Sequence, residues 1–510
     1  MGEASEVDAL PRSRTGSRTG ESSRSGAWAF SFLGLGFEKA GRVIACFVVA
    51  RFLSGDAFGA FLLTLVTINT IGGILGGGLN SSAVHFISGA AEEGEERLSR
   101  SFFALAVWAL GVACVLALLS VWPGPSWLAE RVLLRHDMAL PLAIACVAIV
   151  MFVLSQCGEG MLHGMRQFRT VSFVKMSAAP LTIAAIVGLG IRFGLAGAVW
   201  GLVGGVGWCT VAFVVGALRS ARRRGLRCRR APGRFVLTVG RMAGMVALSN
   251  VMAAMTVWAA HVILTRESGL TSVGLFGAAS QLRNLVALIP ATLGIATLPF
   301  LSRASVQGDW DRLRAIATEY CMLVFAVVGP ACVFFLGMSR EVLTFCYGAG
   351  KSPAWPAANL LFWGQLALMP GLVMAYVVIA RDEVVYGVAA NLLWASIYLA
   401  LGWILASGRA HVGLAAAMLT ASVIQAPVCV AYLAVRRAAR IGRILPPLGI
   451  VLFCAACSQA GTLLPLPAMR FMVSLFAAGA GFAGVWFFGF RAEERCRVTG
   501  KIRSVLHGIR

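Results

Sequence analysis

The chain has 510 residues, of which 58% are hydrophobic and only 13% are charged, and its mean hydropathy is +0.81. Soluble domains contain about 45 to 50% apolar and about 25% charged residues, so this composition excludes an ordinary soluble fold. The formal net charge of +22 at pH 7 could suggest nucleic-acid binding. The distribution of that charge among the loops argues against a nucleic-acid partner.

Apolar residues recur in blocks close to the roughly 20 residues that a helix needs to cross about 30 Å of hydrocarbon. The sequence therefore predicts an all-α polytopic membrane protein with about fourteen transmembrane helices. In chain order, the predicted spans cover residues 27–50, 57–79, 101–122, 138–160, 172–191, 195–217, 236–260, 274–302, 320–338, 357–380, 385–406, 412–435, 446–464 and 468–490.

Basic residues alternate between heavily and lightly loaded loops, as the positive-inside rule describes. With the N-terminus inside, 31 of the 44 Lys and Arg residues fall on the cytoplasmic side and 9 on the opposite side. We therefore expect both termini in the cytoplasm of a bacterium and the chain in its inner membrane. The remaining 44 − 31 − 9 = 4 basic residues lie within predicted spans: Lys39, Arg42, Arg241 and Arg283.

The chain also resembles itself at an offset of 215 residues. Phe58 to Phe61 matches Val273 to Phe276 in part, and the same offset relates Asn69 to Asn284 and Pro141 to Pro356. The segment from Gly194 to Ala198 also resembles the segment from Gly413 to Ala417, at an offset of 219. A unit of six spans crosses an even number of times, so an axis along the membrane normal would relate the two copies.

This duplication predicts two pseudo-twofold-related six-helix bundles with two extra C-terminal helices. The first 26 residues are polar and lack the apolar core of a signal peptide, so we expect a disordered tail. The predicted regions are a cytoplasmic tail over residues 1–26, an N-terminal bundle over 27–218, a basic cytoplasmic linker over 219–234, a C-terminal bundle over 235–435, two additional helices over 446–490 and a basic cytoplasmic tail over 491–510.

Two segments carry a family resemblance. The first runs from Ala50-Arg51-Phe52-Leu53 through Asp56 and Phe58-Gly59 to Gly77–Phe86, and the second is the loop 341–361 with Tyr347-Gly348 and Pro356-Ala357-Ala358. They resemble the polysaccharide biosynthesis, oligosaccharide flippase family of the multidrug/oligosaccharidyl-lipid/polysaccharide exporter superfamily. The resemblance implies two six-helix bundles, a cationic central chamber and transfer of undecaprenyl-pyrophosphate-linked sugars to the periplasmic leaflet.

The first span contains three charged residues, although each charge in a membrane helix costs about 2.5 to 3.5 kcal/mol on insertion scales. Glu38 and Arg42 are four residues apart in the acid-first order that allows an ion pair, and Lys39 projects about 100° away. A structural ion pair between helices remains the alternative interpretation. In the fourth span, Gln156, Glu159, His163 and Arg166 form a stripe that we expect to line a chamber, although His163 is more simply a hydrated interface residue.

In the second half, Arg283 lies beside Gln281 and Asn284, and Arg241 lies near the start of its span. Arginine suits pyrophosphate because its planar fork donates two hydrogen bonds and keeps its charge, although Arg241 could merely reach the interface. We expect one shared chamber for the pyrophosphate and sugars, which Lys39, Arg42 and Arg283 face. The expected substrate-binding residues are Lys39, Arg42, Arg283, Arg241, Asn69, Asn284 and Gln281, with Glu38 and Glu159 for charge compensation or ion coupling.

The sequence predicts a flippase without catalytic residues, metal or cofactor, because translocation breaks no bond. Its expected partners are a lipid-linked oligosaccharide and membrane lipids, with a polysaccharide polymerase and glycosyltransferases as candidate protein partners. The alternatives are a lipid II flippase, a multidrug or cation exporter of the same superfamily, and a membrane-embedded glycosyltransferase or polymerase. Four basic residues against Glu38 and Glu159 disfavour a cation exporter, and loops of about 20 residues or fewer disfavour an enzyme domain.

Overall fold

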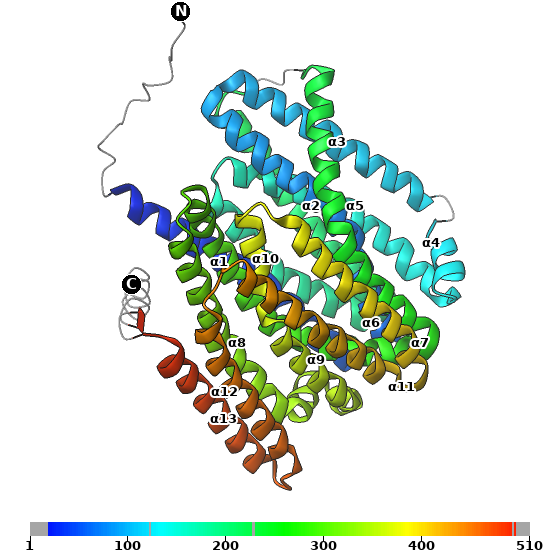
Figure 1. Cartoon of the computed structure of the whole chain (residues 1–510). Coiled ribbons are helices and arrows are strands. Elements are labelled where there is room, and N and C mark those ends of the chain that lie inside the picture. The colour runs from blue at the N-terminus through cyan, green and yellow to red at the C-terminus, as the bar shows by residue number, and fades with distance from the viewer. Residues whose placement is uncertain (1–18, 122–123, 227–229, 492–493, 496–510) are drawn as a thin grey trace, which may run out of the picture.

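The computed structural model describes residues 19–121, 124–226, 230–491 and 494–495, and every regular element in these ranges is helical (Figure 1). The elements are α1 (Thr19–Phe52), α2 (Gly55–Glu93), α3 (Glu95–Val121), α4 (Gly124–Trp127), η1 (Leu128–Val132), η2 (His136–Met138), α5 (Ala139–Gly164), α6 (Phe168–Arg223), α7 (Gly233–Val306), α8 (Trp310–Tyr347), η3 (Ala349–Ala354), α9 (Trp355–Ala367), α10 (Met369–Ala380), α11 (Val384–Val435), α12 (Ile441–Ala460), η4 (Gly461–Leu463), α13 (Pro467–Gly484) and η5 (Val485–Gly489).

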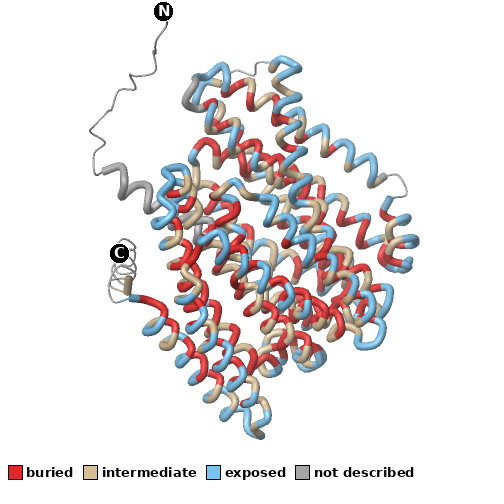
Figure 2. The backbone as a smooth tube through the Cα atoms, viewed as in Figure 1, coloured by how far each residue is buried: buried red, intermediate tan, exposed pale blue. Residues whose placement is uncertain are grey.

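Within the described ranges, nine helical segments are long and apolar enough to cross a membrane, or ten when α9 and α10, bent by 43°, count as one span. Large apolar side chains remain exposed, for example Leu118 at 71% and Phe476 at 80%. Figure 2 shows the exposed residues in pale blue along the helices of the bundle. A helix whose backbone bonds are internally satisfied can present such side chains to lipid. The chain is therefore a multi-pass membrane protein.

Three of the long helices contain one non-helical residue each: Gly194 in α6, Gly269 in α7 and Ala410 in α11. In α6, a Cβ atom at Gly201 would lie 2.5 Å from the Cα of Ile186, and one at Gly205 would collide with the Thr182 side chain. In each pair, the two residues lie about equally far from the break, one before it and one after it. The two segments therefore run antiparallel at close range, as small residues in membrane helices allow. The predicted spans 172–191 and 195–217 correspond to them.

The close approach also corrects one part of the predicted repeat. A Cβ atom at Gly197 would collide with the carbonyl of Leu189, eight residues earlier, and one at Gly413 would collide with the carbonyl of Leu405, also eight residues earlier. Gly197 therefore corresponds to Gly413 at 413 − 197 = 216. The offset of 219 is wrong, because the small-residue runs on either side of these glycines permit several alignments.

The last two helices pack on α8 (Figure 1). A Cβ atom at Gly329 of α8 would lie 2.9 Å from Val451 of α12, and the Ser458 hydroxyl of α12 donates to the Val333 carbonyl at 2.6 Å. Helix α13 approaches the same face, because a Cβ at Gly337 would collide with the Ser474 hydroxyl. Residues 446–490 thus lie against one helix of the second half.

The predicted tails fall only partly within the described residues. Helix α1 begins at Thr19, so residues 19–26, which the sequence assigned to the disordered tail, are helical. Helix ends are poorly determined by sequence, since a polar turn can extend a helix beyond the hydrocarbon. Residues 1–18 of the expected N-terminal tail, 227–229 of the expected linker, and 492–493 and 496–510 of the expected C-terminal tail lie outside the described residues.

Candidate functional site

A cavity of about 590 Å³ lies inside the N-terminal half, among α1, α2, α5 and α6. Asn250 of α7 is its one lining residue from the second half among those that the structure describes. The volume falls within the roughly 300 to 1,000 Å³ that small-molecule pockets occupy. Gly73 and Gly77 of α2 line the wall of this cavity. A Cβ atom at Gly73 would meet nothing within 4 Å, so it would project into the open space.

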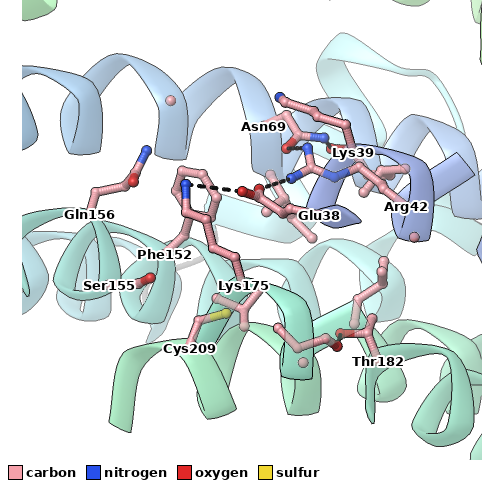
Figure 3. Close-up of a pocket in the computed structure, with 18 of the residues that line it drawn as sticks. Glu38, Lys39, Arg42, Asn69, Phe152, Ser155, Gln156, Lys175, Thr182 and Cys209 are labelled. Atoms are coloured by element: carbon pink, nitrogen blue, oxygen red, sulfur yellow. Dashed lines mark hydrogen bonds and ion pairs between the residues drawn. The ribbon is translucent and has the colours of Figure 1, made fainter. Parts of the chain in front are cut away.

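The charged turn of α1 forms the first part of the site. Arg42 donates to the Glu38 carboxylate at 3.0 Å and to the Asn69 side-chain oxygen on α2 at 2.9 Å (Figure 3). This confirms the predicted pairing of Glu38 with Arg42, which the four-residue spacing on a helix brings together. The Asn69 amide donates in turn to the Leu65 carbonyl at 2.8 Å, so its oxygen is held toward the guanidinium.

Lys175 on α6 links the two carboxylates of the cavity, as Figure 3 shows for Glu38. Its ammonium lies 3.1 Å from Glu38 and 2.6 Å from Glu159, and its side chain is only 13% exposed. Sequence reasoning missed Lys175 as a site residue, because Lys175 lies at the cytoplasmic edge of its predicted span. Its position inside the predicted span 172–191 was the signal that could have identified it, because a basic residue within a span needs a partner.

The second carboxylate, Glu159, belongs to α5. It accepts from Lys175 and lies 3.4 Å from the His163 ring, and Gln156 one turn earlier also lines the cavity. The predicted polar stripe does not extend to Arg166, because α5 ends at Gly164 and Arg166 sits in the following turn with φ 61°. Gln156 and Glu159 therefore line the cavity as predicted, whereas His163 contacts Glu159 but does not line the cavity.

Lys39 is exposed and lines the cavity, and the described residues place no carboxylate within ion-pair distance of it. The cluster then comprises three cations, Lys39, Arg42 and Lys175, against the two carboxylates Glu38 and Glu159. With His163 neutral, its formal charge is 3 − 2 = +1. An excess positive charge in a site partly shielded from water favours an anionic group.

The candidate residues of the second half lie elsewhere. Arg283 on α7 donates to the Asn284 side-chain oxygen at 2.9 Å and to the sulfur of Met418 on α11 at 3.1 Å. Its Nε is buried without a hydrogen-bond partner among the described residues. Arg283, Asn284, Gln281 and Arg241 do not line the cavity, and Arg241 is exposed.

The structure therefore does not bring Arg283 into one cavity with Lys39 and Arg42. Sequence spacing places a residue along its helix, but the rotation of that helix against its neighbours decides which way the side chain points. The halves still share one feature. Asn69 and Asn284, which the 215-residue offset relates, each accept a hydrogen bond from an arginine.

No group of three His, Cys, Asp or Glu side chains suited to a metal ion occurs in the part of the chain that the structure describes. The arrangement can instead bind an anion through Lys39 and Arg42, with Asn69, Asn80 and Gln156 as polar wall groups. Arginine and lysine donate strong charge-assisted hydrogen bonds to phosphate oxygens.

The family model described as "Polysaccharide biosynthesis protein" matches residues 28–305. A putative O-antigen transporter of Shigella flexneri is 23% identical over 340 residues, which cover 63% of this chain and 77% of that relative.

Two solved membrane proteins share the fold. The lipid II flippase MurJ, in an inward closed conformation, superposes with a TM-score of 0.71 at 13% identity, covering 90% of this chain and 97% of the flippase. A multidrug resistance transporter of the MATE family and MOP superfamily, in an inward-facing conformation, gives a TM-score of 0.68 at 14% identity, covering 80% of this chain and 98% of the transporter. At these identities the likeness concerns the fold.

Proposed function

The chain belongs to the polysaccharide biosynthesis protein family, and from that premise we propose that it is a flippase for lipid-linked oligosaccharides. Its substrate is an undecaprenyl-pyrophosphate-linked sugar unit, which it moves from the cytoplasmic to the periplasmic leaflet of the bacterial inner membrane. The product serves the assembly of a surface polysaccharide such as O-antigen, capsule or exopolysaccharide. The observation that carries the proposal is the cavity with one excess positive charge, in which Lys39 has no ion-pair partner among the described residues.

A polar cavity lowers the main energy barrier to this transport, which is the transfer of sugar hydroxyls into hydrocarbon. Each sugar hydroxyl moved into hydrocarbon without a hydrogen bond costs on the order of 4 to 8 kcal/mol. Asn69, Asn80, Gln156 and Ser155 line the cavity and offer such bonds. The sugars and pyrophosphate pass through it, while the isoprenoid tail stays in the bilayer.

The ion network suggests how the pyrophosphate is held. Lys39 attracts it first, because no described carboxylate lies within ion-pair distance of the Lys39 ammonium. Arg42 then exchanges Glu38 for a phosphate oxygen and donates two parallel hydrogen bonds. Glu38 keeps Lys175 at 3.1 Å after that exchange, so no buried carboxylate is left without a partner. The exchange is therefore reversible, and the anion can be released.

The proposed topology has fourteen spans with both termini in the cytoplasm. The breaks at Gly194, Gly269 and Ala410 divide α6, α7 and α11 into two spans each, and α9 with α10 forms one. Alternating access follows from movement of the two six-helix bundles about a pseudo-twofold axis, with Arg283 as the anion-binding residue contributed by the second bundle.

Depletion of the protein in its own host tests the substrate class. Lipid extracts of depleted cells should accumulate an undecaprenyl-pyrophosphate-linked oligosaccharide, and re-expression of the protein should remove it. Accumulation of lipid II would assign the chain to peptidoglycan synthesis. Extracts without any accumulated undecaprenyl-linked intermediate would reject the flippase function.

A further inference from the structure

A second pocket lies on the side of the N-terminal half, away from the charged cavity. It has a volume of about 430 Å³ and is formed by α3, α5 and the second segment of α6. Its residues recur at helical spacing on three facing helices, as Ser99, Phe102, Phe103, Ala106, Ala109 and Leu110 do on α3. The pocket is a gap between three apolar helix faces that no side chain fills.

The pocket has a polar end and an apolar body. Its polar side chains are Ser99 and Arg222, which lie near the start of α3 and the end of α6, and the rest of its lining is apolar. Arg222 is exposed and makes no ion pair with the described residues. An apolar space of this kind does not retain water, so in a bilayer a hydrocarbon chain is its natural occupant.

The length of the pocket indicates which kind of hydrocarbon chain it can hold. From Ser99 to Leu110 is 110 − 99 = 11 residues, or about 16 Å of helix at 1.5 Å per residue. That is close to half of the roughly 30 Å hydrocarbon thickness, so the pocket spans one leaflet. A fatty acyl chain of a phospholipid in that leaflet has this reach.

The positive charge at the polar end of the pocket favours a lipid with an anionic headgroup. Arg219, Arg223 and Arg224 lie beside Arg222, and all are exposed. Clusters of basic residues at the end of a membrane helix attract anionic lipid headgroups. The same residues belong to the linker that the positive-inside rule places in the cytoplasm, so the occupied leaflet is the cytoplasmic one.

We propose that this pocket binds an anionic phospholipid of the cytoplasmic leaflet, with one acyl chain between α3, α5 and α6 and the phosphate at Arg222. The lipid fastens α3 to the N-terminal bundle. The protein itself covers little of that helix, because only 22% of its most apolar window is buried. The site does not depend on which sugar the cavity transports.

Native mass spectrometry of the purified full-length protein tests the proposal, with palmitoyl-oleoyl-phosphatidylglycerol or the matching phosphatidylethanolamine added in equal amounts. The wild-type protein should retain the phosphatidylglycerol preferentially. Arg222→Ala should lower that retention by about fivefold, which corresponds to one lost basic contact at a membrane surface. Arg219→Ala is the matched control, because Arg219 has the same charge but does not line the pocket.

A second variant tests the apolar body. Ala106 is exposed and lines the pocket, so Ala106→Trp should fill it and abolish retention of both lipids. Val107→Trp, on the adjacent lipid-facing position, should leave retention unchanged, and both variants should remain monodisperse. Unchanged retention in Ala106→Trp, equal loss in Arg219→Ala and Arg222→Ala, or displacement of the phospholipid by equimolar undecaprenyl phosphate would overturn the proposal. Flux of oligosaccharide is measured separately, so a failed lipid site leaves the proposed transport function intact.

Discussion

Gly59 of α2 and Gly274 of α7 face one another so closely that a Cβ atom built on either would lie 3.2 Å from the backbone nitrogen of the other. They are 274 − 59 = 215 residues apart, which is the offset of the internal repeat. Asp56 and Thr271 show the same separation, and the Thr271 hydroxyl donates to the Asp56 carboxylate at 2.5 Å. Reciprocal contacts between corresponding residues are what a twofold relation between two halves produces.

Gly59→Val tests the role of this contact. The added side chain would collide with the Leu270 carbonyl, and such overpacking costs about 1 to 3 kcal/mol. We expect α2 and α7 to separate at this end. A disulfide between cysteines placed at Asp56 and Thr271 should then form far less efficiently, as measured by peptide mass spectrometry. Gly89→Val is the control on the same helix, since a Cβ there meets nothing within 4 Å. Equal cross-linking in both variants would contradict the contact.

Lys175→Gln should strongly destabilise the protein. It would leave Glu159 and one oxygen of Glu38 without their cation, and removing one partner of a buried pair costs about 3 to 5 kcal/mol. Thermal unfolding in detergent should show a large drop in midpoint. Arg100→Gln removes a more exposed partner of Glu96 and should change stability by less than about 1 kcal/mol. Similar midpoints for the two variants would mean that Lys175 is not the cation on which the network depends.

The breaks in α6 and α11 adopt the same backbone conformation, with glycine at one and alanine at the other. Ala410 has φ 48° and ψ −131°, a region that a residue with a Cβ occupies only with strain, and Gly194 adopts φ 60° and ψ −135° at the corresponding break. Ala410→Gly should therefore raise the free energy of unfolding, and Gly194→Ala should lower it, each by about 1 to 3 kcal/mol. The thermal unfolding midpoints of the two variants should shift in the same directions. A stabilised Gly194→Ala variant, measured by the same thermal unfolding, would show that the break at Gly194 is not left-handed.

Reporter fusions test the topology. Fusions after Arg224 and after Ile502 should both report the cytoplasm, because the predicted topology puts 31 of the 44 basic residues on that side and 9 on the other. The measurement compares a cytoplasm-active reporter with a periplasm-active one at each position. A periplasmic signal at either position would reverse the orientation and with it the leaflet of the proposed phospholipid.

Much of the helical layout could be predicted from the sequence, because a span is set mainly by the length of an apolar block. The breaks at Gly194, Gly269 and Ala410 fall in the short gaps between predicted spans. The Glu38–Arg42 pair was also predictable, since it depends only on spacing within one helix.

The rest of the site depends on contacts between helices, which spacing does not encode. Lys175 reaches Glu38 from α6, and Asn69 reaches Arg42 from α2. The direction of Arg283 toward Met418 is set by the packing of α7 against α11. Sequence reasoning therefore identified most of the charged residues but placed Arg283 in a shared chamber that the structure does not form.

We propose that Lys39 and Arg42, with Arg283 in the second half, engage the pyrophosphate during translocation. The direct measurement is flux of a lipid-linked oligosaccharide in proteoliposomes at matched protein levels. Alanine at any of the three positions should impair flux, and Arg42→Lys should lower it by about tenfold or more, because lysine lacks the bidentate fork. Lys39→Arg should retain most activity, and Arg312→Ala, at an exposed arginine outside the cavity, should behave as wild type. Full flux in all three alanine variants would show that these three side chains do not engage the pyrophosphate, even with the fold unchanged.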